Sequence, residues 1–219
     1  KIAFPKSSAD VAGLLRQMAK NPLNVPRPTN DQLDQLAVAF APVFAIDVSG
    51  EYDRIGMPIV ATNGAPTLNT RFPVVFVQPS WTIFDGIPMV QISYLVWFSE
   101  RPSTGSMDIL SGRLDGLIWR VTIDSNGRPI LYDSIHPCGC YHLFFPVPPV
   151  SLKEHPINEP SEGTVVPTNA PALGPNQRML LHLSSGNHYL RALSATTADT
   201  YSSTRYKFAS MDILRNLPL

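Results

Sequence analysis

Two histidines and two cysteines alternate within one short segment, and they are the strongest candidates for chemistry in the chain. The segment reads His136-Pro-Cys138-Gly-Cys140-Tyr-His142. Imidazole and thiolate ligands suit zinc or copper, whereas magnesium and calcium prefer oxygen ligands. Zinc would activate a water molecule, and copper would transfer electrons or handle oxygen. We therefore predict a zinc or copper ion held by some of these four side chains, with the reaction left open.

Two other interpretations of the cysteines stay open. Free cysteine is among the most buried residue types, so Cys138 and Cys140 could be small structural side chains in a non-catalytic binding or assembly module. Alternatively, the Cys-Gly-Cys pair could exchange thiol for disulfide, because the tight ring formed on oxidation is strained and easily reduced. The spacing matches no common zinc signature, so the sequence does not decide whether the chain is an enzyme.

A β-hairpin is expected to position this segment. Asn126-Gly127 lies between two alternating strands, and this dipeptide is the strongest short-range signal for a type I′ turn. The turn predicts these cross-strand pairs: Ile123 with Ile130, Val121 with Tyr132, Trp119 with Ser134, Arg120 with Asp133, and Leu117 with His136. Because the register joins opposite charges and gathers apolar residues on one side, we place His136 on the apolar face.

A straight strand could not bring all four side chains to one ion. Same-face neighbours are about 6.7 Å apart, so the outer pair would be about 20 Å apart. Pro137 and Gly139 permit a bend, which would bring two or three of the side chains within bonding distance. We therefore expect two or three ligands rather than four.

Other titratable residues are second choices. His182 and His188 flank Ser-Ser-Gly-Asn in a second predicted hairpin, where they could be further metal ligands, an acid/base pair, or ordinary strand-surface side chains. Asp47, Glu51 and Asp53 could supply paired carboxylates or a calcium site, although a turn with its caps is the simpler interpretation. Serine-nucleophile, phosphate-loop and dinucleotide motifs are absent from the sequence.

Apolar periodicity predicts an α+β, β-rich fold with one domain, residues 1–219. A short N-terminal helical pair is expected within 8–41, where the second helix begins at a capping box, Thr29-Asn-Asp-Gln32. The period changes to two over 43–145, most clearly in Met89 to Phe98, which predicts an antiparallel sheet or a sandwich of hairpins. A Pro-rich coil, 146–178, and a C-terminal hairpin and tail, 179–219, follow.

Composition narrows the partners and the location. Charged residues make up 16% of the chain, the net charge is zero, and lysine and arginine form no stripe, so nucleic acid is not expected as a partner. No apolar run reaches the ~20 residues of a membrane-spanning helix. The chain opens on Lys1, which suggests a piece of a longer precursor, and a removed secretory signal would fit. We expect a secreted or periplasmic protein that contacts a protein partner or the remainder of its precursor.

Overall fold

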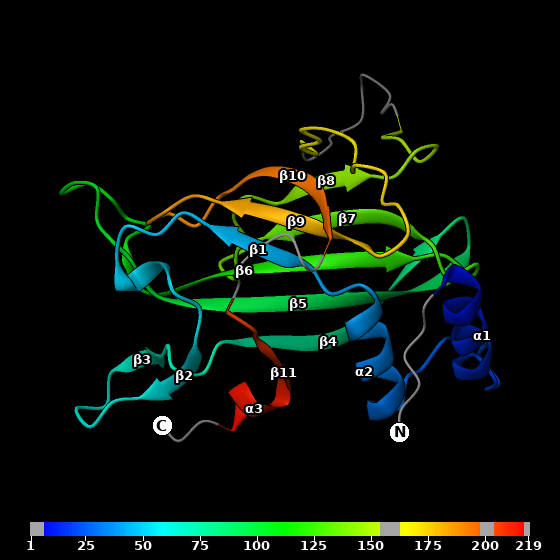
Figure 1. Cartoon of the computed structure of the whole chain (residues 1–219), viewed down its shortest axis with the longest axis horizontal. Helices are drawn as coiled ribbons and strands as arrows, with labels where there is room; N and C mark the ends of the chain where they lie inside the picture. Colours follow the sequence, from blue (N-terminus) through cyan, green and yellow to red (C-terminus); the bar gives the residue numbers. More distant parts are fainter. Residues whose placement is uncertain (1–6, 154–162, 198–203, 217–219) are drawn as a thin grey trace.

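The computed structural model describes residues 7–153, 163–197 and 204–216, and its largest sheet has six strands (Figure 1). Their order is β11 (Lys207–Ser210), β4 (Val74–Phe84), β5 (Ile87–Arg101), β6 (Gly112–Ile123), β7 (Pro129–Ile135) and β8 (Leu143–Pro146). A second sheet has the order β1 (Val43–Ile46), β9 (Gln177–Leu183) and β10 (Leu190–Thr197). A separate pair is formed by β2 (Met57–Val60) and β3 (Pro66–Asn69). The predicted β-rich α+β fold is confirmed.

The main core lies between the two larger sheets. Alternate residues of β5 face it and are fully buried: Val90, Ile92, Tyr94, Val96 and Phe98. They belong to one cluster with Leu181 and Leu183 of β9. On the opposite face of β5, Leu95 packs in a smaller cluster with residues of β4. The far half of β5 is therefore covered on both sides.

Each of the two longer helices begins at a capping side chain. The side chain of Ser7 caps α1 (Ser8–Met18), and Thr29 with Gln32 forms the predicted capping box of α2 (Asn30–Ala39). The hydroxyl of Tyr94 donates a 2.9 Å hydrogen bond to the carbonyl of Ala37, which ties α2 to the large sheet. Two short helices, η1 (Glu51–Asp53) and α3 (Asp212–Arg215), complete the described elements. None of these helices is long and apolar enough to cross a membrane.

The hairpin of β6 and β7 has the predicted register along most of its length. The observed pairs are Ile118 with Ile135, Trp119 with Ser134, Arg120 with Asp133, Val121 with Tyr132, and Thr122 with Leu131. The prediction was wrong beside the turn, where Ile123 pairs with Pro129 instead of Ile130. One strand is therefore bulged at this position.

The turn itself explains this shift. Gly127 has a φ of 75°, whereas Asn126 is not in the left-handed region that a type I′ turn requires. The carboxylate of Asp124 accepts backbone hydrogen bonds from Asn126 and Arg128, at 2.9 and 2.8 Å, and stabilises a type I turn followed by a bulge. Left-handed residues at both central positions occur instead in the β4–β5 turn, at Asp85-Gly86.

Two pairs of parallel strands were not predicted from the sequence. Strands β1 and β9 pair in parallel, and so do β11 and β4. The predicted coil, 146–178, includes residues 154–162, which lie outside the described ranges. In its described part beyond β8 the coil makes an isolated bridge, from Leu143 to Val165, before β9 begins. The second predicted hairpin is confirmed as β9 and β10.

Candidate functional site

A carboxylate between two buried histidines is the most unusual polar feature of the described chain. Oδ2 of Asp115 lies 2.7 Å from Nδ1 of His188, and Oδ1 lies 3.3 Å from Nδ1 of His136. Asp115 is on β6, His136 directly follows β7, and His188 belongs to the loop between β9 and β10. The relative exposures of His136 and His188 are only 3% and 0%. The cluster therefore joins both larger sheets through one carboxylate.

The aromatic ring of Phe98 forms one wall of the cluster. Phe98 lies opposite Asp115 in the β5–β6 ladder. The imidazole of His188 stacks on the Phe98 ring, with centroids 3.7 Å apart and planes 3° apart. This stacking and the hydrogen bond to Asp115 fix the orientation of the His188 ring.

Asp53 fixes the loop that carries His188. Its carboxylate accepts hydrogen bonds from the backbone N–H groups of Ser49, Gly50 and Gly186, and from the hydroxyl of Ser185. Burial raises the pKa of Asp53, but these hydrogen bonds outweigh it and hold the pKa below its ordinary value. The simpler sequence interpretation, a turn with its caps, therefore describes Asp53 correctly, but it missed the long-range contact with the β9–β10 loop.

The charge on Asp115 determines which imidazole nitrogens carry hydrogen. Burial raises the pKa of Asp115, but the hydrogen bonds from His136 and His188 outweigh it, so the pKa lies well below that of an ordinary carboxyl. Because an ionised carboxylate only accepts hydrogen bonds, both Nδ1 atoms are the donors. In a neutral imidazole the other nitrogen, Nε2, is then an acceptor.

The Nε2 atoms of both histidines are buried and have no hydrogen-bond partner among the described residues. For His188, Nε2 is 3.3 Å from Oδ1 of Asp53, close enough for an ion pair when the ring is protonated. For His136, no charged group takes that place in the described chain. A buried polar atom without a partner is costly, so Nε2 of His136 is the atom of this cluster that calls for a functional explanation.

Backbone strain is concentrated at the same place. Three described residues other than glycine, asparagine and aspartate have left-handed φ angles: Leu114 at 61°, Tyr141 at 56° and His188 at 51°. All three belong to the cluster or adjoin it. Bulky residues in this region are uncommon, and such strain gathers at functional sites.

Two tyrosines and an arginine surround His136. The rings of Tyr141 and Tyr189 each lie 5.5 Å from the His136 ring, in edge-on contacts, and their own centroids are 4.3 Å apart. Arg101 donates a 3.0 Å hydrogen bond from Nη2 to the hydroxyl of Tyr189. Tyr141 is the exposed member of the pair.

A cavity of about 240 Å³ lies beside the cluster. The polar residues that line it are Asp115, His136, Arg101, Arg113, Cys138 and Tyr141. The cavity thus places an oriented imidazole, a phenol and two positive charges around one space. This combination can bind a small molecule and exchange a proton with it.

The structure does not keep the four predicted metal ligands together on one face of the sheet. The bend at Pro137 to Gly139 is confirmed, because Gly139 has a φ of 84° and its N–H donates to the carbonyl of His136. His136 is on the apolar side of the sheet, as the register predicted. Cys138 is exposed and Cys140 is half-buried, and the two are free thiols. Such positions are not those expected of structural core cysteines.

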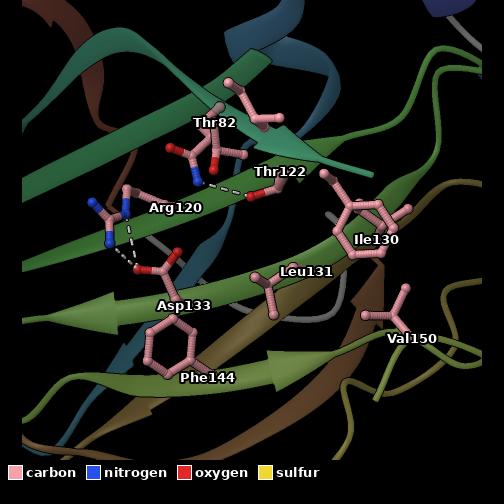
Figure 2. Close-up of a pocket in the computed structure, with 11 residues that line it drawn as sticks. Thr82, Arg120, Thr122, Ile130, Leu131, Asp133, Phe144 and Val150 are labelled. Atoms are coloured by element: carbon pink, nitrogen blue, oxygen red, sulfur yellow. Dashed lines mark hydrogen bonds and ion pairs between the residues drawn. The ribbon is translucent and has the colours of Figure 1, made fainter. Parts of the chain in front are cut away.

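His142 lies on the opposite face of the sheet from His136. Its Nε2 is 3.0 Å from Oδ1 of Asp133, which also accepts hydrogen bonds from Nε and Nη2 of Arg120. Figure 2 shows Arg120 and Asp133 facing each other on this face of the sheet, where they line a second cavity of about 290 Å³. Because Arg120 and Asp133 neutralise each other there, this cavity offers no equivalent of the unpartnered imidazole nitrogen.

No group of three or more His, Cys, Asp or Glu side chains in the described ranges is arranged to hold a metal ion. The zinc or copper ion therefore stays an untested prediction. Of the second-choice histidines, His182 contacts the hydroxyl of Ser194 at 2.9 Å, away from the cluster. His188 is not the strand-surface residue of the simpler interpretation, but a buried part of the site.

The thiol of Cys140 is not activated in this arrangement. Contact with the Cys138 side chain, together with partial burial, raises the pKa of the Cys140 thiol. Since the thiolate is the reactive form, a raised pKa makes Cys140 a weaker nucleophile at neutral pH. This observation gives no support to thiol exchange as the main chemistry.

Sequence reasoning missed Asp115, Arg101 and the two tyrosines as site residues. Asp115 is two residues before Leu117 in β6, so the two side chains lie on the same, apolar face of the strand, where an aspartate is unexpected. That signal was present in the register. By contrast, the proximity of Arg101 and Tyr189 depends on the packing of the two sheets and had no local signal.

Comparisons with protein-family models, with curated proteins and with solved structures gave no significant match.

Proposed function

We propose that the chain is an enzyme that moves a proton through Nε2 of His136 on a small molecule bound in the adjoining cavity. One observation carries the proposal: this nitrogen is buried and has no hydrogen-bond partner among the described residues, while Nδ1 of the same ring is oriented by Asp115. A carboxylate behind a histidine fixes its tautomer and stabilises the imidazolium that forms when Nε2 accepts a proton. A positioned base of this kind typically contributes about 10² to 10⁴-fold to a rate.

His188 serves as a positioning residue in this proposal. It donates a hydrogen bond to the second oxygen of Asp115 and so prevents the carboxylate from rotating away from His136. The stacking on Phe98 and the hydrogen bonds of Asp53 hold His188 in turn. These contacts hold the backbone of His188 in the left-handed region, which is a strained conformation for this residue.

Access to Nε2 requires a movement of Tyr141. The nitrogen is shielded from solvent, and Tyr141 is the exposed side chain in contact with its ring. Because Tyr141 follows the turn at Gly139, displacement of this short segment would open the imidazole to the cavity without a change in the sheets. Exclusion of water from the closed site would strengthen the electrostatic interactions within it.

A chromogenic proton-abstraction probe tests the proposal without knowledge of the natural substrate. When a base removes the ring proton of a nitrobenzisoxazole, the N–O bond breaks and the oxygen keeps the electron pair as a coloured phenolate. We expect the wild-type chain to accelerate this reaction and His136→Gln to lose about 10²-fold of the acceleration. His142→Gln, on the opposite face, is the matched control and should retain the rate. Equal rates for wild type and His136→Gln would refute the proposal.

A metal ion is the second candidate, and one observation favours it. His136 and Cys138 line the same cavity, and metal-ligating histidines also donate their other N–H to a carboxylate. Elemental analysis of the purified chain and of Cys138→Ser separates the two candidates. Stoichiometric zinc or copper that is lost in Cys138→Ser would support the metal, whereas proton abstraction that persists in the presence of a chelator would support the base.

A further inference from the structure

We infer that the ligand of this cavity is a small organic oxyanion, a carboxylate or a phosphate attached to an apolar group, bound by Arg101 and Arg113. The inference rests on the proposed function, because it names the ligand class of the same cavity. The charged residues that line the cavity support it. Asp115 is the carboxylate among the lining residues, and its two oxygens are already occupied by the histidines. The charge of Asp115 also acts on Arg101, but its oxygens accept no hydrogen bond from that residue, so the N–H groups of the guanidiniums are left to bind a ligand.

Arg101 is held in place with most of its donors unused. Its guanidinium carbon lies 5.0 Å from the centre of the Tyr189 ring, and Nη2 donates to the hydroxyl of the same residue. A guanidinium has five N–H donors, and the described residues accept a hydrogen bond from Nη2 alone. Contact with the tyrosine orients the planar group in advance, which lowers the entropic cost of binding an oxyanion.

Arg113 supplies a second positive charge from the neighbouring strand. It lines the cavity, its side chain is exposed, and it forms no hydrogen bond or ion pair with the described residues. Glu100 lies opposite Arg113 in the β5–β6 ladder, but the two side chains do not approach within 4.0 Å as an ion pair. An anion in the cavity would therefore meet a guanidinium that has no ion-pair partner among the described residues.

The remaining lining indicates the rest of the ligand. Ile109 and Leu110 line the cavity together with Pro137, and the exposed fractions of Ile109 and Leu110 are 93% and 40%. Exposed apolar side chains at the edge of a charged cavity suit a ligand with a hydrocarbon part. The volume is below the roughly 300 to 1,000 Å³ of sites for drug-sized ligands, so the ligand is small.

Calorimetric titration with benzoate, phenyl phosphate and the neutral isostere benzamide tests this inference. We expect saturable binding of at least one anion and at least tenfold weaker binding of benzamide. The stronger of the two anions identifies the carboxylate or the phosphate as the recognised group. Higher salt should weaken anion binding, because Arg113 is exposed. Equal affinity for benzoate, phenyl phosphate and benzamide, or no saturable binding of either anion, would overturn the inference.

Arginine variants locate the binding site. Arg101→Gln and Arg113→Gln should each weaken anion binding at least tenfold, while Arg128→Gln, at the distant β6–β7 turn, should not change it. Arg101→Lys keeps the charge and provides a second test if Arg101→Gln does not fold. The same loss in Arg128→Gln would contradict the assignment. Because titration records association alone, anion binding without proton abstraction would refute only the proposed function, and proton abstraction without anion binding would refute only this inference.

Discussion

Nδ1 of His188 and Oδ2 of Asp115 lie 2.7 Å apart, although 73 positions separate the two residues in the chain. The contact connects the β9–β10 loop of the smaller sheet to β6 of the larger one. Since the other oxygen of Asp115 faces His136, one carboxylate positions two imidazoles. The stability of the chain and its proposed chemistry therefore depend on the same side chain.

Replacement of Asp115 by asparagine should destabilise the fold. The amide retains an acceptor for one Nδ1–H but presents N–H groups to the other, so a buried donor loses its partner. We expect a loss of about 2 to 4 kcal/mol in the free energy of unfolding, measured by urea denaturation. Asp85→Asn is the matched control, because Asp85 is an exposed turn residue, and it should change stability by less than about 0.5 kcal/mol. Equal effects of the two changes would contradict the role of Asp115.

Acid should weaken the fold through the same carboxylate. The folded-state pKa of Asp115 lies below the roughly 3.9 of the unfolded chain, so the unfolded chain takes up the proton first as the pH falls. The stabilisation is fully present above about pH 4 and is lost as the pH falls towards the folded-state pKa. Unfolding measured at a series of pH values should therefore show a shallower acid decline for Asp115→Asn than for wild type. Parallel profiles would show that Asp115 is not the group concerned.

The β6–β7 turn should tolerate no side chain at Gly127. A Cβ atom there would lie 2.7 Å from the backbone nitrogen of Ala12 and still closer to the carbonyl oxygen of Ser8, both in α1. Gly86 has the same φ of 75° but open space around it, so Gly86→Ala measures the backbone strain alone. We expect Gly127→Ala to cost about 1 to 3 kcal/mol more than Gly86→Ala in thermal or urea unfolding. A difference near zero would mean that the turn does not pack on α1.

The hydroxyl of Tyr94 should contribute to stability, whereas that of Tyr132 should not. Tyr94 donates to the carbonyl of Ala37 from a fully buried position, so Tyr94→Phe should cost about 1 kcal/mol or somewhat more. The Tyr132 hydroxyl has no hydrogen-bond partner in the described chain, and phenylalanine would preserve the stacking on Trp119. Tyr132→Phe should therefore be nearly neutral. The reverse order of the two effects would refute the attachment of α2 to the sheet through Tyr94.

The sequence predicted those structural elements that are determined by residues close together in the chain. The capping box at Thr29, the alternation in β5 and most of the register of β6 with β7 depend on neighbouring residues, and each was found. The parallel pairs of β1 with β9 and β11 with β4 join segments more than 100 residues apart. No local pattern specifies such partners, because they are selected by the packing of the whole domain.

The candidate site shows the same division. The register placed His136 on the buried face, but the turn at Gly139 and the left-handed Tyr141 direct His142 to the other face. The expectation that four alternating residues of one strand share a face therefore fails beyond the bend. The partner of His136 proved to be Asp115, whose side chain comes from the adjacent strand, and the partner of Asp115 comes from the other sheet.

The tautomer of His136 is the most direct test of the account, and it needs no substrate. Heteronuclear NMR correlations between the imidazole nitrogens and the carbon-bound ring hydrogens distinguish a protonated Nδ1 from a protonated Nε2. For the neutral ring in the wild-type chain we predict hydrogen on Nδ1 and a bare Nε2, and we predict loss of this preference in Asp115→Asn. A neutral His136 with its hydrogen on Nε2 in the wild type would contradict the central claim that Asp115 orients this imidazole as a base.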